Sequence, residues 1–166
     1  MSKVSDIHYS RRHFLKRKQL KQVNNALTDY YRYDFHLMDL GVERASSKEG
    51  DILILDKVPT FFSLEGCFYL TLRGHNRYPI ITKYVTVDMG AIPYLVNGAD
   101  VMAPGIIDAD ISIKEGDIIW VRDEKNLKPI LVGKSRESGE RLVSLSKGKV
   151  VATLHFVGDA LWNAEL

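Results

Sequence analysis

The stretch VDMGAIPYLVNGADVMAPGI (87–106) contains three glycines and two prolines, yet most of its other residues are apolar. A surface loop is usually more polar, and the interior of a strand does not tolerate so much glycine and proline. The stretch therefore predicts short elements joined by tight turns. They are a strand that ends near Asp88, a helix over 91–97, a strand over 99–105 and a turn at Pro104-Gly105.

The local chemistry of this stretch supports that division. Pro93 falls in the first turn of the expected helix, where its missing N–H does no harm. Asn97-Gly98 is typical of a left-handed helix cap. Gly90, Gly98 and Gly105 leave backbone uncovered beside an apolar surface, which an unpaired base or a sugar–phosphate chain can approach closely.

The same stretch resembles the signature of the PUA domain, an RNA-binding module named after pseudouridine synthases and archaeosine transglycosylases. The ending LHFVGDALW (154–162) is similar to a C-terminal pattern common among these domains. The resemblance covers roughly residues 77–162, with the spacing expected between its two ends. It implies a pseudo-barrel of about six strands with a helix packed at one rim.

The preceding segment GDILILDKVPTFFSLEGCFYLTLRGHNRYP (50–79) resembles the pre-PUA region of small two-part proteins. This family includes the MCT-like proteins and the ligatin-type initiation factors. The second part of the chain also resembles the PUA domain of archaeosine tRNA-guanine transglycosylase. The MCT-like and ligatin-type members act on the small ribosomal subunit. Leu70 departs from the family, which usually has proline before the TLR triplet.

The family's RNA surface implies contacts from the helix 91–97, its cap and the strand 99–105, flanked by the strand 149–157. Three lysines are expected near the same rim, where they would hold phosphates. Ile92, Leu95 and Val101 are expected in the core, and Met102 fits either the core or the surface. The implied RNA-binding residues are Lys83, Gly90, Ala91, Gly98, Ala99, Met102, Pro104, Gly105, Lys147 and Lys149.

The expected fold is an α+β pre-PUA domain over residues 1–76, followed by a mostly β PUA pseudo-barrel over 77–166. Hydrophobic spacing predicts an amphipathic helix over 14–31, and RGHNRYP (73–79) is the expected boundary. In the first domain, strands are predicted at 33–37, 51–56 and 60–72, the last with a turn at Glu65-Gly66. In the second, they are predicted at 83–88, 111–113, 117–123, 129–135 and 149–157.

Positive charge is concentrated at the start of the chain. Net charge is +2 overall, whereas residues 1–23 carry seven Lys or Arg against one Asp, a net +6. Such a cluster attracts phosphate backbones. Arg11, Arg12, Lys16 and Lys18 are therefore candidate phosphate contacts, and the alternative is a solvated helix face.

Catalytic motifs are missing from the sequence. It has no GxSxG elbow and no P-loop, and its five histidines lack metal-ligand spacing. Asp108 and Asp110 share a face if they lie in a strand, but they are also ordinary turn residues. Cys67 is expected to be a small core hydrophobe. The prediction is a protein that is not an enzyme, with no cofactor and no metal.

The sequence thus predicts a cytoplasmic RNA-binding protein that recognises tRNA or rRNA. One such protein would be a ribosome-associated translation factor. The single cysteine and the lack of a long apolar run support the compartment and predict no membrane partner. Its expected partners are RNA and either the small ribosomal subunit or an RNA-modifying enzyme. In the second case the protein would be the non-catalytic RNA-binding subunit of that enzyme. An enzyme that uses Asp108 and Asp110, and a protein-interaction module without RNA binding, remain as alternatives. The oligomeric state stays open.

Overall fold

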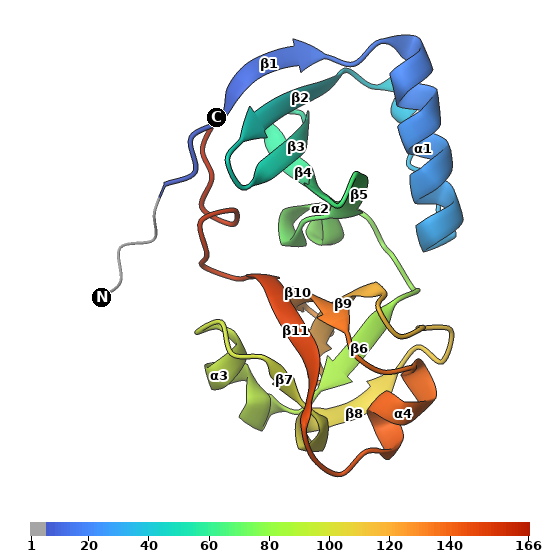
Figure 1. Cartoon of the computed structure of the whole chain (residues 1–166), viewed down its shortest axis with the longest axis vertical. Helices are drawn as coiled ribbons and strands as arrows, with labels where there is room; N and C mark the ends of the chain where they lie inside the picture. The colour runs from blue at the N-terminus through green and yellow to red at the C-terminus, as the bar shows by residue number, and fades with distance from the viewer. Residues whose placement is uncertain (1–5) are drawn as a thin grey trace. The chain divides into compact units, whose positions relative to one another are not determined.

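The computed structural model of the protein describes residues 6–166. The described chain divides into two compact units, whose elements are labelled in Figure 1. The N-terminal unit runs to Ile80 and also contains Asn163–Leu166, and the C-terminal unit is Ile81–Trp162.

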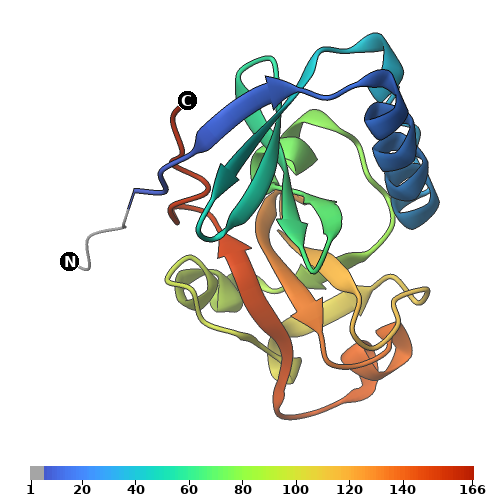
Figure 2. The ribbon, with the colours of Figure 1, turned by 45° about the horizontal axis from the view of Figure 1, so that its top comes forward.

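The N-terminal unit is a five-stranded antiparallel sheet with helix α1 beside it (Figure 2). Its strands neighbour one another in chain order, β1-β2-β3-β4-β5, because tight turns join most of them. Helix α1 buries Leu20, Leu27 and Tyr31 against the sheet residues of the core. The elements are β1 (Ser10–Phe14), α1 (Arg17–Tyr31), η1 (Leu37–Asp39), β2 (Val42–Ser47), β3 (Gly50–Leu55), β4 (Val58–Leu64), β5 (Cys67–Leu70) and α2 (Leu72–Arg77).

Several predictions for this unit are confirmed and one predicted strand is wrong. The helix and the turn at Glu65-Gly66 are present, and both turn residues have positive φ. The strand predicted over 33–37 is missing, because His36 adopts a left-handed conformation and η1 begins at Leu37. The polar segment 73–79 lies largely in α2, whose cap Thr71 accepts a hydrogen bond from the Gly74 amide at 3.0 Å.

The C-terminal unit is a six-stranded mixed sheet that curls into a half-barrel. The strand order is β7-β11-β10-β9-β6-β8, in which only the β6–β9 pair is parallel among the described strands. The elements are β6 (Tyr84–Val87), η2 (Met89–Ala91), α3 (Ile92–Leu95), β7 (Val101–Met102), η3 (Ala103–Gly105), β8 (Ile106–Ala109), β9 (Ile118–Asp123), β10 (Pro129–Ser135), α4 (Gly139–Ser144) and β11 (Lys149–Phe156).

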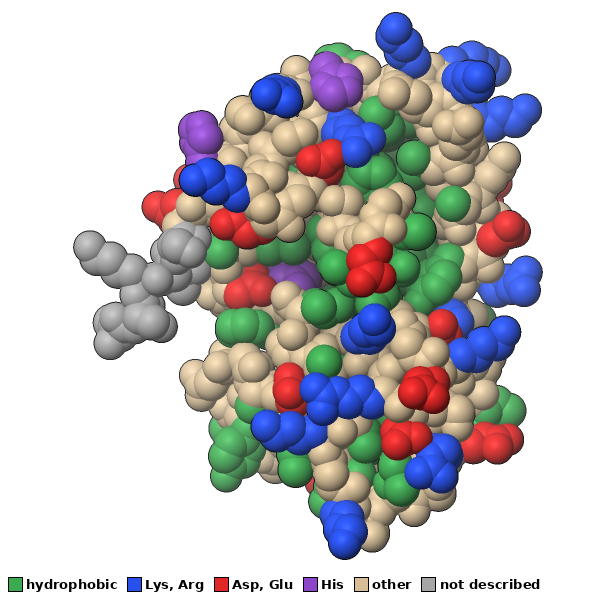
Figure 3. Space-filling model, in the orientation of Figure 1, with side chains coloured by type: hydrophobic (Ala, Val, Ile, Leu, Met, Phe, Trp, Pro, Cys, Tyr) green, Lys and Arg blue, Asp and Glu red, His purple; other side chains and the backbone are tan. Residues whose placement is uncertain are grey.

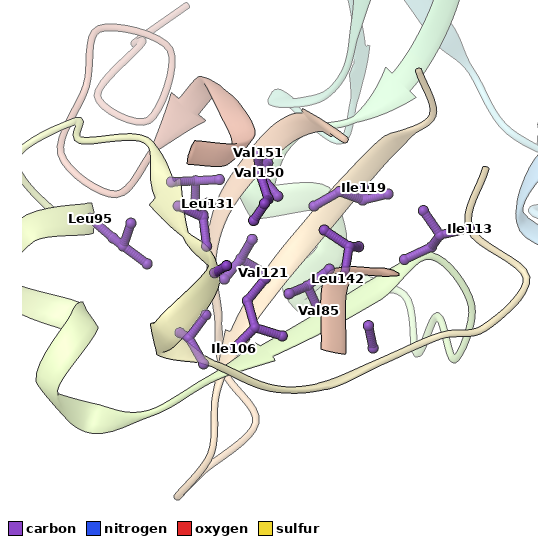
Figure 4. Close-up of a cluster of buried hydrophobic side chains, with 14 of the residues drawn as sticks. Val85, Leu95, Ile106, Ile113, Ile119, Val121, Leu131, Leu142, Val150 and Val151 are labelled. Atoms are coloured by element: carbon purple, nitrogen blue, oxygen red, sulfur yellow. The ribbon is translucent and has the colours of Figure 1, made fainter. Parts of the chain in front are cut away.

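Branched aliphatic side chains fill the interior of this half-barrel (Figure 4). Val85, Val121, Leu131 and Val151 are fully buried and come from four different strands. Leu95 from α3 joins the same cluster, so the core fixes the position of this short helix.

The expected number of strands in the second domain is confirmed, with differences in detail. The strand predicted at 111–113 is wrong: β8 ends at Ala109, and Asp110 accepts hydrogen bonds from Ser112 that stabilise a turn. The helix expected over 91–97 is shorter, since α3 spans Ile92–Leu95. Helix α4 was not predicted.

Candidate functional site

A pocket of about 530 Å³ opens on the C-terminal unit between α3, η2 and the β7–η3 segment. This volume lies within the usual range of ligand pockets, ~300–1,000 Å³. Its lining is mostly apolar, with Asp88, Asp100 and Lys149 as the charged residues. We call it the α3 pocket.

Local sequence preferences shape the α3 pocket. The Asp88 carboxylate caps η2, because its Oδ1 accepts a hydrogen bond from the Ala91 amide at 3.0 Å. Pro93 follows in the first turn of α3. The Asn97 side-chain Nδ2 then donates to the Pro93 carbonyl at 2.8 Å, and Gly98 reverses the chain with φ +87°. The chain thereby returns along the opposite wall of the pocket.

Most of the residues expected to contact RNA meet in this pocket. Seven of the ten line it: Gly90, Ala91, Ala99, Met102, Pro104, Gly105 and Lys149. Met102 is 45% exposed, which decides the open question about this residue in favour of the surface. Leu95 and Val101 are buried as expected, and Ile92 packs partly buried against the core.

Gly98 is a structural residue and does not line the pocket. A Cβ atom at this position would lie 3.0 Å from the Phe156 ring, and the φ of +87° is strained for any other residue. Gly98 is partly exposed but does not line the pocket, and its expected contact with RNA stays a prediction.

Three lining residues were missed from the sequence: Asp88, Asp100 and Tyr94. Tyr94 is 70% exposed although it lies in a helix with an apolar sequence. Ile92 and Leu95 turn toward the core, so helical spacing places Tyr94 on the opposite face. The helical spacing of these residues could therefore have predicted that Tyr94 is exposed.

The charges of the pocket are opposite to those of a phosphate site. Two carboxylates line it. Among the residues that the structure describes, Lys149 is the one lysine or arginine in the lining. Lys147 is also exposed and lies in the loop before β11, but it does not line the pocket. The lining therefore suits a neutral group better than a phosphate, and the nearby positive charge comes from Lys149 and from Lys147 outside the lining.

Comparison with known proteins identifies the family. The model of the PUA domain matches residues 83–157. An uncharacterized protein of Methanocaldococcus jannaschii is 38% identical over 155 residues, which cover 92% of this chain and 96% of that protein. The chain belongs to the PUA-domain family. A solved conserved PUA domain protein from Thermoplasma acidophilum is 29% identical with a TM-score of 0.81, over 94% of this chain and 100% of that one.

Two eukaryotic relatives match a shorter region. Translation machinery-associated protein 20 of Eremothecium gossypii is 33% identical over 102 residues, and Malignant T-cell-amplified sequence 1 of Rattus norvegicus is 31% identical over 117. The matches cover 58% and 68% of this chain, and 56% and 64% of those relatives. The resemblance to MCT-like proteins is thereby confirmed, over less than two thirds of their length.

Lys83 lies elsewhere in the PUA domain. It precedes β6, whereas the pocket begins with Asp88 at the other end of that strand. Its Nζ donates to Asp117 Oδ2 at 2.6 Å, and the two side chains are only 13% and 18% exposed. The expectation that Lys83 lies on the same rim is wrong, because the strand separates them and the ammonium is already paired.

Asp110 of the PUA domain stabilises a turn. Asp110 accepts hydrogen bonds from the Lys83 and Ser112 amides at 2.6 and 2.9 Å. Burial by itself would raise the pKa of Asp110, but these hydrogen bonds outweigh it and hold the pKa below its usual range. Asp108 is exposed on β8. This arrangement gives Asp110 a structural role and supports no acid–base pair.

A second carboxylate organises the end of the domain. Asp159 accepts hydrogen bonds from His155 Nδ1 at 2.9 Å and from the amides of Phe156 and Trp162 at 2.9 and 2.8 Å. Burial would raise its pKa, yet the hydrogen bonds, led by His155, hold the pKa below the usual range. Since the Phe156 ring lies against Gly98, Asp159 helps to hold the turn that closes the α3 pocket.

The N-terminal unit carries an open basic surface, which we define as Arg11, Arg12, Lys16, Arg17, Lys18 and Lys21. All six residues are exposed and lie on β1, at the N-cap of α1 or in its first turns, and Figure 3 shows Lys and Arg gathered over this end of α1. Arg12 pairs with Glu43 at 3.1 Å. Lys3, part of the charged cluster in the sequence, lies outside the described residues.

Other groups in the described chain offer no catalytic arrangement. Cys67 is exposed and lines a separate pocket of about 390 Å³ beside α1, so its expected place in the core is wrong. Within residues 6–166, no cluster of three or more His, Cys, Asp or Glu side chains could bind a metal ion. Each helix in that range is too short or too polar to cross a lipid bilayer.

Proposed function

We propose that this PUA-domain protein binds structured RNA and that the α3 pocket receives an unpaired nucleotide at or near a single-stranded end. The observation that carries the proposal is the meeting of seven expected contact residues in one apolar pocket. Lys149 lines the pocket and Lys147 lies two residues before it in the chain; both are exposed and would contact phosphates.

The pocket offers the kinds of contact that unpaired nucleotides use. Single-stranded RNA is commonly bound by stacking of bases on aromatic side chains and by close approach to backbone. Tyr94 presents an exposed ring, and Gly90 and Gly105 leave backbone accessible in the lining. The recognition requires no bond to be made or broken.

The role we propose is connected with translation. The name of the relative Translation machinery-associated protein 20 supports this setting. Within it, tRNA and rRNA are the proposed RNAs, and the small ribosomal subunit is the proposed partner. The proposal predicts that the protein sediments with small subunits from a lysate, whereas a subunit of an RNA-modifying enzyme would co-purify with a catalytic chain.

A matched pair of variants tests the pocket. Ala99→Glu places a negative charge in the lining, whereas Ile111→Glu makes the same change of charge at an exposed position outside it. We expect Ala99→Glu to weaken binding of unmodified tRNA and of a hairpin with a single-stranded 3′ overhang by tenfold or more, measured by fluorescence anisotropy.

Ile111→Glu should bind these RNAs like the unaltered protein. Circular dichroism would establish that both variants are folded. Equal affinities for Ala99→Glu and Ile111→Glu would refute the pocket as the RNA site. Loss of affinity in both would indicate a general effect of charge on this unit.

A further inference from the structure

The side chains that line the α3 pocket carry a net negative charge. Asp88 and Asp100 contribute carboxylates, whereas the Lys149 ammonium and the Tyr94 hydroxyl are the side-chain donors among its described lining residues. A phosphate inside would face both carboxylates, so phosphates fit the edge better than the interior. The group that enters should be a base that donates hydrogen bonds.

The two carboxylates are not equivalent. Asp100 is engaged on both sides, since Oδ1 accepts from the Thr153 amide at 2.9 Å and Oδ2 lies 3.9 Å from the Arg136 guanidinium. Asp88 uses Oδ1 for the Ala91 amide. Its Oδ2 accepts no hydrogen bond from any residue of the described chain, 6–166. Because Asp88 lines the pocket, its Oδ2 is an acceptor available to a ligand.

The four bases differ in what they present to such an acceptor. Adenine, cytosine and guanine carry an exocyclic amine, which donates to a carboxylate. Uracil has no amine: it carries a carbonyl where cytosine has its amine, and its N3–H lies between two carbonyl oxygens that repel an approaching carboxylate. A carbonyl against the Asp88 carboxylate would leave two acceptors facing each other without a hydrogen atom, after both had lost water.

We propose that Asp88 selects the nucleotide that enters the α3 pocket, by accepting a hydrogen bond from an exocyclic base amine and disfavouring uracil. This inference rests on the proposed RNA binding of the pocket. It adds a residue that determines specificity and a defined class of base. The apolar walls and Tyr94 bind any base, whereas Asp88 distinguishes among them.

The test compares RNAs that differ in one chemical group. Hairpins with a common stem carry a short 3′ overhang of adenosine, cytidine, guanosine, uridine or purine riboside, which is adenosine without its amine. On the unaltered full chain, we expect the three amine-bearing overhangs to bind about tenfold more tightly than uridine. Purine riboside should lose about the same factor relative to adenosine.

Substitution of Asp88 by asparagine provides the complementary test. In Asp88→Asn the side-chain oxygen still caps Ala91, while the amide replaces the free acceptor by a donor. We expect the variant to bind uridine overhangs at least as well as cytidine overhangs and to bind adenosine and purine riboside equally. Asp108→Asn, an exposed carboxylate outside the pocket, should keep the unaltered preference.

Each outcome bears on one of the two proposals. Equal affinity of the unaltered protein for adenosine and purine riboside overhangs overturns selection by Asp88, and this comparison needs no variant to fold. If Ala99→Glu still weakens binding in that case, the pocket remains an RNA site without this selectivity. If none of the hairpins binds, the proposed function fails and selection by Asp88 fails with it.

Discussion

The α3 pocket of the PUA domain and the basic surface of the N-terminal unit differ in almost every physical respect. The pocket is concave and mostly apolar, and its lining holds two carboxylates and one lysine. The basic surface is a row of exposed side chains on β1 and α1, and Arg11, Lys16 and Lys18 have no ion-pair partner among residues 6–166.

This contrast separates two kinds of RNA contact. Exposed cations neutralise phosphates, so their effect depends strongly on salt and little on base sequence. An apolar pocket with a free acceptor discriminates among bases, and its effect depends weakly on salt. The proposed division is that the PUA domain recognises the nucleotide and the basic surface adds affinity.

The substitution with the largest expected effect disrupts the pocket and leaves the basic surface unchanged. Asp159→Ala removes the partner of buried His155 and of two backbone amides. We expect the free energy of unfolding to fall by about 3 kcal/mol, measured by urea denaturation. RNA binding should retain only a weak, salt-sensitive component. An unfolding free energy equal to that of the unaltered protein would contradict the role of Asp159.

The same carboxylate predicts a dependence on pH. Because its pKa is depressed in the folded state, ionised Asp159 contributes stability above the pKa of the unfolded chain, about 3.9. That contribution should be lost as the pH falls through the folded pKa, and Asp159→Ala should lack it.

The next prediction compares Lys83, which has a structural role, with Lys149 of the pocket. Lys83→Gln removes the charged partner of Asp117 in a largely buried pair. We expect a loss of about 2 kcal/mol in stability and no change in RNA affinity of the folded protein. Lys149→Gln should lower the RNA affinity and leave the stability unchanged. A drop in affinity for Lys83→Gln at full folding would place Lys83 on the RNA surface after all.

A smaller effect tests stacking within the pocket. Tyr94→Ala removes an exposed ring and should weaken RNA binding about tenfold, within the range measured for loss of one stacked base. Its stability should change by less than about 0.5 kcal/mol, because the side chain is not in the core. Tyr94→Phe keeps the ring and is the matched control. Equal affinities of the two variants would exclude stacking on Tyr94.

The smallest effect at moderate salt belongs to the basic surface. Combined replacement of Arg11, Lys16 and Lys18 by glutamine should lower the slope of log affinity against log salt by about 2. Base preference should stay as it is. Replacing the exposed Lys57, Lys125 and Lys128 changes the net charge equally and serves as control. If both sets alter the slope alike, the effect is one of overall charge.

Much of the fold follows from local sequence. The helical spacing of Leu20 and Leu27 gave α1, and the turn residues Glu65-Gly66 gave the β4–β5 hairpin. The segment 33–37 was misread because partial alternation does not reveal that His36 turns the backbone left-handed. Helix α4 was missed because six residues are too short for a periodic signal.

The pocket was only partly predictable. Gly90, Ala91 and Pro104 were placed by their resemblance to a known signature, and the structure brings them together. The pairing of Lys83 with Asp117 and the contact of Gly98 with Phe156 join residues far apart in sequence. Such contacts depend on the order of the strands in the sheet, and a single sequence does not specify that order.

The most direct test of the account is an amide chemical-shift titration of the full chain with the hairpin that carries the adenosine overhang. We predict that the largest shifts occur at the amides of Gly90, Ala91, Ala99 and Gly105, with smaller shifts over residues 11–21. Shifts confined to residues 11–21, with the pocket amides unchanged, would contradict the claim that the α3 pocket receives the nucleotide.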